Sequence, residues 1–180
     1  MSSSDQPAGA SSGMKMLWAP WRLEYIKGER DPGCPFCTGP AEGPKEDNLV
    51  LWTDKDISVV MNKFPYNPGH LLIIPRAHVA NPGDLEARVW VKLSEAVRAC
   101  LEILKEDSQP PGFNLGMNLG SSGGAGIPQH LHWHILPRWN GDTNFMPLIA
   151  ETKALPIHNA TVYRRLKPLF ETFSTRLSQR

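Results

Sequence analysis

The hydrophobic and polar positions along the chain follow two periods, and each period predicts one kind of secondary structure. Short runs that are apolar throughout, or that alternate with polar residues, are bounded by Gly, Pro, Asn or Asp, which is typical of β-strands. These runs are residues 49–52, 57–61, 70–74, 113–119 and 131–137. Between the third run and the fourth, apolar residues recur every three or four positions from about Pro82 to Glu106, which predicts a long amphipathic helix.

The order of these elements predicts the fold class. A closing helix is predicted from Asn159 to Leu177, with an interruption at Pro168, which has no backbone N–H to continue the helix. Three strands, a helix, two strands and a helix favour an α+β domain on an antiparallel sheet of about five strands. We expect one domain over residues 14–180, because residues 1–13 contain too little apolar material to fold and are predicted to be disordered.

Charge and composition exclude several function classes. The 19 Lys and Arg residues nearly balance the 18 Asp and Glu residues, so the net charge of +1 creates no strong field for nucleic acid or an anionic membrane. No apolar run approaches the length of a transmembrane helix, and the first residues lack the features of a secretory signal. We therefore expect a cytoplasmic protein that binds neither nucleic acid nor membranes and recognises phosphate groups only locally.

Three histidines alternate with apolar residues in the fifth predicted strand. His130, His132 and His134 are separated by Leu131 and Trp133. On a β-strand this alternation places the three imidazoles on one face, with about 6.5 to 7 Å between successive residues of that face. Three titratable rings so close together suit a polyphosphate group or a metal ion better than a purely structural role.

Two of the three cysteines form a Cys-x-x-Cys pair, Cys34 and Cys37, in a predicted loop rich in Gly and Pro. Thiolates and imidazoles together suit a closed, structural zinc site, with His78 and His130 as the candidate third and fourth ligands. A free thiol pair and a redox Cys-x-x-Cys are the alternatives, although the chain lacks the βαβ pattern of thioredoxin-like proteins. Cys100 falls on the apolar stripe of the predicted helix and is expected in the core.

The segment from His130 to Leu136, HLHWHIL, resembles the His-φ-His-φ-His-φ-φ signature of the histidine-triad superfamily, where φ is an apolar residue. The segment from Asn62 to Pro75 is similar to the family's ribose-contacting residue followed eight positions later by a fourth histidine, here His70. The flanking segments resemble the branch that contains bacterial diadenosine tetraphosphate phosphorylases. These segments are residues 17–26, 112–120 and 137–145. The resemblance implies the histidine-triad fold and, together with the tryptophans near the N-terminus, suggests a homodimer.

The resemblance also implies a mechanism. His132 would attack the α-phosphorus of a nucleotide to form a covalent nucleotidyl-histidine, and His134 would hold the nonbridging oxygens or help to protonate the leaving group. His70 would support the triad by hydrogen bonds, with a buried histidine beside a turn as the alternative interpretation of that residue. Water as acceptor would make the enzyme a hydrolase, whereas inorganic phosphate would make it a phosphorylase that converts diadenosine tetraphosphate to ADP and ATP. A divalent cation could accompany the polyphosphate.

The resemblance and the loop composition together indicate which residues contact the nucleotide. Asn62 matches the family position that contacts ribose hydroxyls, although an Asn at a strand end is also a common turn former. The loop from Gly120 to Gly126 offers unobstructed backbone amides to phosphate oxygens, although such a loop also serves as a plain hairpin connection. The candidate nucleotide contacts are Asn62, Asn118, Gly120, Ser122, Gly124, Gly126 and Gln129.

One departure from the family pattern bears on the acceptor. Many histidine-triad hydrolases carry Gln four residues before the first histidine, where this chain has Gly126. The missing side-chain donor favours a phosphorylase, with a dinucleoside polyphosphate or nucleoside phosphoramidate hydrolase as the alternative. Two alternatives from other classes stay open: a zinc metallohydrolase in which the three histidines bind a catalytic metal, and a nucleotide-binding interaction protein.

Overall fold

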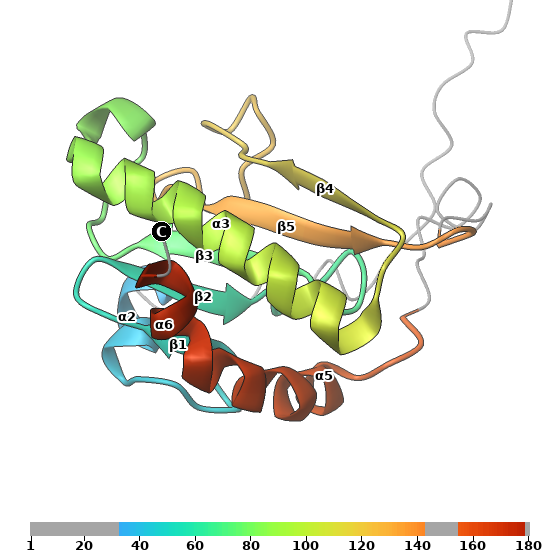
Figure 1. Ribbon diagram of the computed structural model, residues 1–180. Helices are drawn as coiled ribbons and strands as arrows, with labels where there is room; N and C mark the ends of the chain where they lie inside the picture. The colour runs from blue at the N-terminus through green and yellow to red at the C-terminus, as the bar shows by residue number, and fades with distance from the viewer. Residues whose placement is uncertain (1–32, 143–154, 179–180) are drawn as a thin grey trace, which may run out of the picture. The chain divides into compact units, whose positions relative to one another are not determined.

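A five-stranded antiparallel sheet organises the part of the chain that the structure describes, residues 33–142 and 155–178 of a computed structural model (Figure 1). The strands are β1 (Val50–Thr53), β2 (Ile57–Met61), β3 (Leu71–Pro75), β4 (Gly112–Gly116) and β5 (Trp133–Arg138). Their order across the sheet is β1-β2-β3-β5-β4, and every neighbouring pair is antiparallel. The predicted α+β class and the antiparallel sheet of five strands are therefore confirmed.

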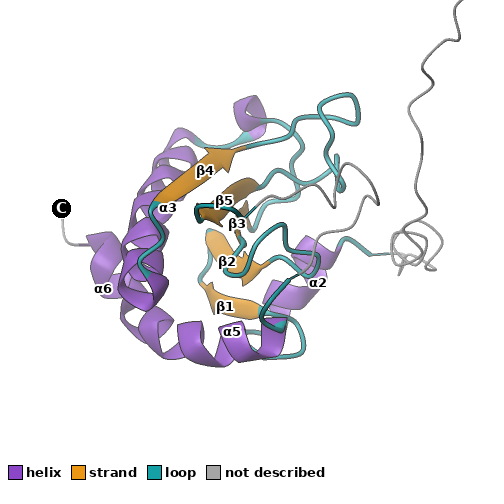
Figure 2. Cartoon of the chain, turned by 90° about the vertical axis from the view of Figure 1, so that its right-hand side faces the viewer, coloured by secondary structure: helices purple, strands orange, loops and turns teal. Residues whose placement is uncertain are grey.

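Helices lie on both sides of this sheet. Helix α3 (Ala87–Ser108), α5 (Asn159–Leu166) and α6 (Phe173–Ser178) lie on one side, whereas the short α2 (Pro35–Ala41) lies on the other, as Figure 2 shows. Two 3-10 segments adjoin these helices. They are η1 (Pro82–Asp84), before α3, and η2 (Lys167–Thr172), between α5 and α6.

Two apolar clusters of different size cover the two faces of the sheet. On the α3 side, Ile73 of β3 and Leu93 of α3 belong to a large core whose members are almost fully buried. On the α2 side, a small cluster consists of Val50, Val60, Leu72 and Ile74, with Phe36 of α2 packed against it. The large core supplies most of the stability, since each fully buried aliphatic side chain contributes about 1.5–3 kcal/mol. The opposite face carries only the small apolar cluster, so the rest of it is available to polar side chains.

Most predicted elements are present, with boundaries that differ by a few residues. Strand β2 has the predicted bounds, and Cys100 is fully buried, as its place on the apolar stripe predicts. The long helix begins at Ala87 rather than near Pro82, because Leu85 and Glu86 have extended backbones with ψ of 145° and 136°. The predicted interruption at Pro168 is confirmed, because this residue lies in η2 between two helices.

The prediction of a loop around the cysteine pair is wrong. Cys34 is the residue before α2 and Cys37 lies in the first turn of this seven-residue helix. Pro35 occupies the start of α2, where its fixed φ suits a helix and its missing N–H costs nothing. The Pro and Gly residues around the pair concealed a helix this short from a pattern analysis.

The N-terminal predictions, namely disorder over residues 1–13 and a domain that starts at residue 14, lie outside the described residues. Within the described ranges, no helix is long and apolar enough to cross a membrane.

Candidate active site and metal centre

The segment from His130 to His134 forms the start of β5 and the residues just before it. His134 lies on the sheet face that carries the small apolar cluster. His134 pairs across the sheet with Leu72 of β3 and Gly116 of β4. Directly paired residues share a face, so His134 lies on the side of the sheet opposite to α3, beside Leu72. A Cβ atom placed on Gly116 would meet nothing within 4 Å. There is accordingly open space next to His134.

The prediction that all three histidines lie on one strand is wrong in part. Strand β5 begins at Trp133, so that His130 and His132 precede it. The pairing of β3 with β5 ends at Trp133, and the Leu131 N–H donates to the Val79 carbonyl oxygen at 2.7 Å instead. The ring of His132 still lies 4.8 Å from that of His134, centroid to centroid, whereas His130 contacts the two cysteines.

Hydrogen bonds to His70 fix the proton positions of two imidazoles. The Tyr66 backbone N–H and the Asn62 Nδ2 both donate to His70 Nδ1, at 3.2 and 3.3 Å. Because Nδ1 accepts, the proton of the neutral His70 ring lies on Nε2, which donates to His134 Nδ1 at 2.9 Å. His134 then carries its own proton on Nε2, a buried atom with no hydrogen-bond partner among the described residues. The site thus contains an unused N–H donor.

His132 is held in the opposite tautomer. Its Nδ1 lies 2.8 Å from the His130 carbonyl oxygen, and a carbonyl can only accept, so Nδ1 carries the proton. The lone pair of the neutral ring is therefore on Nε2. His132 provides a nucleophilic nitrogen and His134, beside it, provides a donor.

Burial keeps these rings neutral. The pKa of His70 is lowered to about 3. Desolvation by burial is the largest cause, and the nearby charges of His134 and His132 are smaller ones. Desolvation followed by the charge of His132 lowers the pKa of His134 to about 4. Burial also lowers the pKa of His132, against the opposing effect of its bond to the His130 carbonyl. At neutral pH all three imidazoles are uncharged, which nucleophilic attack by His132 requires.

A second cluster, the cysteine–histidine centre, consists of Cys34, Cys37, His78 and His130. One potential ligand atom from each residue lies within 4.8 Å of every other. The Cys34 Sγ and His130 Nδ1 are 3.3 Å apart, as are the Cys37 Sγ and His78 Nδ1, and Cys37 Sγ to His130 Nδ1 is 3.6 Å. His130 Nε2 donates to the Pro75 carbonyl at 2.9 Å, which leaves Nδ1 free of its proton and aimed at the sulfur atoms.

The donor set fits tetrahedral zinc. Zn–S and Zn–N bonds of about 2.3 and 2.0–2.1 Å place tetrahedral ligand atoms about 3.4–3.8 Å apart, close to the 3.3–3.6 Å of the three sulfur–nitrogen contacts given above. Two sulfurs and two imidazole nitrogens are also a common ligand set of structural zinc sites. All four predicted metal ligands are thus brought together. The cluster does not include His132 or His134.

Comparisons with known proteins identify the family to which the chain belongs. The HIT domain family matches residues 44–141, which is more than half of the chain. A protein of Mycobacterium tuberculosis named AP-4-A phosphorylase is 35% identical over 161 residues, which cover 84% of this chain and 82% of that protein. The chain belongs to the HIT domain family.

Solved structures of other HIT proteins share the fold. A Zn-bound histidine triad family protein from Mycobacterium smegmatis superposes with a TM-score of 0.62 at 20% identity, over 79% of this chain and 96% of that one. A hypothetical histidine triad nucleotide-binding protein from Sulfolobus tokodaii gives the same TM-score at 23% identity, over 78% of this chain and 94% of that one. At these identities the likeness concerns the fold alone.

The predicted nucleotide contacts of this HIT protein fall into two groups. Asn62 is next to the histidines, where its Nδ2 contacts His70 and its Oδ1 accepts from the Phe64 N–H at 2.9 Å. The loop residues lie in an exposed turn, which Asn118 closes through a 3.4 Å bond from Nδ2 to the Gly124 carbonyl. No hydrogen bond within the described ranges joins this turn to His132 or His134. The other loop residues are Gly120, Ser122, Gly126 and Gln129.

Several residues near the site escaped the pattern analysis. Gly123 is required in the exposed turn, because a Cβ atom there would collide with the Leu119 carbonyl oxygen. Tyr66 stacks on the His70 ring with centroids 5.1 Å apart, and Phe36 contacts His132 at 5.0 Å. Phe36 lies inside the Cys-x-x-Cys pair, and Tyr66 lies between Asn62 and His70. An aromatic residue at these positions was the signal in the sequence for both contacts.

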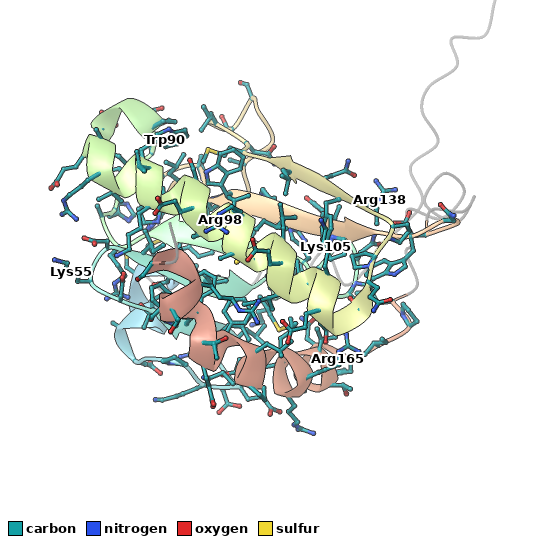
Figure 3. All side chains as sticks on the ribbon, viewed as in Figure 1. Lys55, Trp90, Arg98, Lys105, Arg138 and Arg165 are labelled. Carbon is teal, nitrogen blue, oxygen red and sulfur yellow. The ribbon has the colours of Figure 1, made fainter. Side chains whose placement is uncertain are left out.

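A buried carboxamide ties the His70 turn to the end of β5. The Asn67 Nδ2 donates to the Pro137 carbonyl at 2.8 Å and to the Asp142 Oδ2 at 2.7 Å. The Asp142 carboxylate also pairs with Arg138, which lies at the C-terminal end of β5 (Figure 3). Because the Asn67 carbonyl accepts from the His70 N–H at 3.2 Å, this network supports the backbone of His70.

The lowered pKa of His70 predicts a loss of stability in acid. The unfolded chain binds a proton at His70 below pH about 6.5, whereas the folded chain does so only near pH 3, so stability rises with pH between these values. We expect the free energy of unfolding to fall on the order of 2 kcal/mol more between pH 7 and pH 5 in the wild type than in His70→Asn. Urea unfolding at both pH values measures this difference, and equal losses would contradict it.

Proposed function

We propose that this HIT protein is a nucleotidyltransferase that cleaves diadenosine tetraphosphate through a covalent nucleotidyl-histidine at His132, with inorganic phosphate as the acceptor. The observation that carries the proposal is the tautomer pair, a lone pair on His132 Nε2 beside an N–H on His134 Nε2. The relative named AP-4-A phosphorylase supports the choice of substrate and acceptor.

The two nitrogens suit the two halves of a displacement at phosphorus. His132 Nε2 forms a bond to the α-phosphorus while the bond from that phosphorus to the bridging oxygen breaks and ATP leaves. The His134 N–H donates to the departing oxygen or to a nonbridging one, a contribution typically worth about 10²–10⁴ in rate. The phosphorylated imidazole carries a positive charge, which the bond from Nδ1 to the His130 carbonyl stabilises. A phosphate oxygen then attacks, the P–N bond breaks and ADP is released.

The acceptor depends on the loop that precedes the triad. The exposed turn from Gly120 to Gly126 carries no side-chain amide at Gly126, and its backbone amides suit an incoming phosphate. We propose Asn118, Ser122 and Gln129 as its side-chain contacts and Asn62 as the ribose contact. A hydrolase of dinucleoside polyphosphates or nucleoside phosphoramidates is the second candidate, since water can replace phosphate in the final step.

Purified protein incubated with diadenosine tetraphosphate and magnesium should form ADP and ATP only when inorganic phosphate is present. His132→Asn should reduce the rate at least about a thousandfold, because no other group can replace the nucleophile. Chromatography of the nucleotides measures both results. AMP and ATP formed regardless of phosphate would indicate the hydrolase, and tight nucleotide binding without turnover would indicate an interaction protein.

We further propose that zinc occupies the cysteine–histidine centre in a structural role. A closed set of four protein ligands leaves no position for a reacting water. The zinc would fix α2 to the His130 ring and to His78, which follows β3. The Zn-bound relative from Mycobacterium smegmatis supports this choice of metal.

Elemental analysis should find about one zinc ion per purified chain. Cys34→Ser and Cys37→Ser should lose the metal and unfold at a temperature several degrees lower, because metal binding adds to folding free energy. Cys100→Ala is the matched control, since this buried thiol lies in the main core and its loss should lower stability without releasing zinc. Metal-free, fully active wild type would refute the zinc proposal.

We propose a homodimer on the evidence of strand β4, which is an edge strand of the sheet among the described residues. Leu115 in β4 is 47% exposed and Leu119 beyond it 45% exposed, so apolar side chains accompany the unpaired backbone. A second copy of the chain could cover both.

Sedimentation should therefore give twice the mass of one chain. Leu115→Lys should shift the protein toward monomer, whereas Leu155→Lys, at an exposed apolar residue near α5, should leave the mass unchanged. A wild-type monomer at micromolar concentration would rule out this dimer.

A further inference from the structure

Phe36 joins the cysteine–histidine centre to the nucleophile. It lies between Cys34 and Cys37 in the sequence, and its ring contacts two histidine rings at once. The ring centroid lies 5.5 Å from that of His130, edge to face, and 5.0 Å from that of His132. On its other side the ring packs against the small apolar cluster of Val50, Val60, Leu72 and Ile74. One side chain, flanked in sequence by the two cysteines, thus contacts the rings of both His130 and His132.

His130 is a second connection between the two sites, but it does not depend on the metal. Its Nε2 donates to the Pro75 carbonyl, and the neighbouring Leu131 N–H donates to the Val79 carbonyl. Both bonds reach the chain at the end of β3. The carbonyl that accepts from His132 is accordingly held in place whether or not the sulfurs bind a metal.

Helix α2 lacks comparable anchors at its N-terminal end. Cys34, the residue before the helix, makes no side-chain capping bond. The C-terminal half is fixed by the Asn48 Nδ2, which donates to the Gly39 carbonyl at 3.1 Å, and by the buried Pro40. Among the described residues, the polar atoms of Cys34 and Cys37 reach the rest of the fold only through sulfur. Release of those sulfurs removes the polar links of this half of α2 and leaves it held, within the described part of the chain, by the packing of Phe36 alone.

We propose that Phe36 is a positioning residue through which the occupied cysteine–histidine centre orients the imidazole of His132. The inference rests on the proposed role of His132 as nucleophile. The Nδ1 bond to the His130 carbonyl fixes one edge of the imidazole but permits the ring to tilt about that bond. Contact with Phe36 removes this freedom and keeps Nε2 directed at the phosphorus. A misplacement of about 1 Å at a reacting atom can reduce a rate about a hundredfold.

The first experiment compares Phe36→Ala and Phe36→Leu with the wild type, using diadenosine tetraphosphate and phosphate. Phe36→Ala should keep its zinc and its KM within about twofold while kcat falls about ten- to a hundredfold. Phe36→Leu, which restores most of the apolar volume, should recover most of the loss. The matched control is Phe113→Ala, because Phe113 is a half-buried ring on the α3 side of the sheet and should leave kcat unchanged. A raised KM at unchanged kcat would overturn the proposal and make Phe36 a substrate contact.

The second experiment tests the coupling to the metal without reference to turnover. The ¹⁵N and ¹H resonances of the His132 ring, assigned by their absence from His132→Asn, are recorded before and after removal of zinc by a chelator. In the wild type, metal removal should shift the His132 resonances in the same direction as the Phe36→Ala substitution does. In Phe36→Ala, metal removal should cause little further shift, because the connecting side chain is already absent. If metal removal shifts the His132 resonances as much in Phe36→Ala as in the wild type, the proposal is wrong. If the wild type turns over no nucleotide, the proposed function fails, yet these spectra still decide whether Phe36 couples the two sites.

Discussion

The hydrogen bond from His132 Nδ1 to the His130 carbonyl oxygen is the interaction on which the proposed chemistry depends. A neutral imidazole has one proton, and a carbonyl acceptor places it on Nδ1, so that Nε2 has the lone pair. His134 receives a donor on its Nδ1 from His70 and has the opposite tautomer. Neighbouring rings of the same residue type therefore differ in function, because one Nδ1 faces an acceptor and the other faces a donor.

Desolvation maintains this arrangement. His70 is 1% exposed and His132 is 5% exposed, and in such surroundings a charged imidazole is disfavoured. With the pKa of His70 at about 3 and that of His134 at about 4, neither ring titrates near neutrality. The tautomers therefore persist across the pH range of a cell. The chain as a whole has almost no net charge, so it creates no strong long-range attraction for a charged ligand.

The sequence allowed a prediction of much of the fold, because its apolar positions repeat with clear periods. The five strands and the long helix follow from those periods, and the buried Cys100 follows from its place on the helical stripe. Helix α2 could not be predicted, because seven residues with two prolines carry no readable period. The start of β5 at Trp133 depends on where pairing with β3 ends, and this is a tertiary property.

The candidate site was predictable to a different extent. Histidines and cysteines at recognisable spacings indicated both clusters, because three alternating imidazoles and a Cys-x-x-Cys pair suit the binding of a ligand or metal better than a purely structural role. The supporting residues Phe36 and Tyr66 gave no such signal, since an aromatic residue in a motif has many ordinary roles in packing. The contact of Phe36 with His132 arises only when segments distant in sequence meet, and that of Tyr66 with His70 depends on the turn between the two residues.

His130 links the two clusters because its side chain and its backbone serve different sites. The ring faces Cys34 and Cys37, whereas the carbonyl oxygen accepts from His132. If β5 began at His130, the ring would join His132 and His134 on one face, and a separate cysteine–histidine centre could not form. Because pairing begins at Trp133, the backbone turns beforehand and the two functions separate. The irregular backbone before β5 is therefore the feature that lets the ring of His130 join the cysteine–histidine centre while its carbonyl oxygen orients the ring of His132.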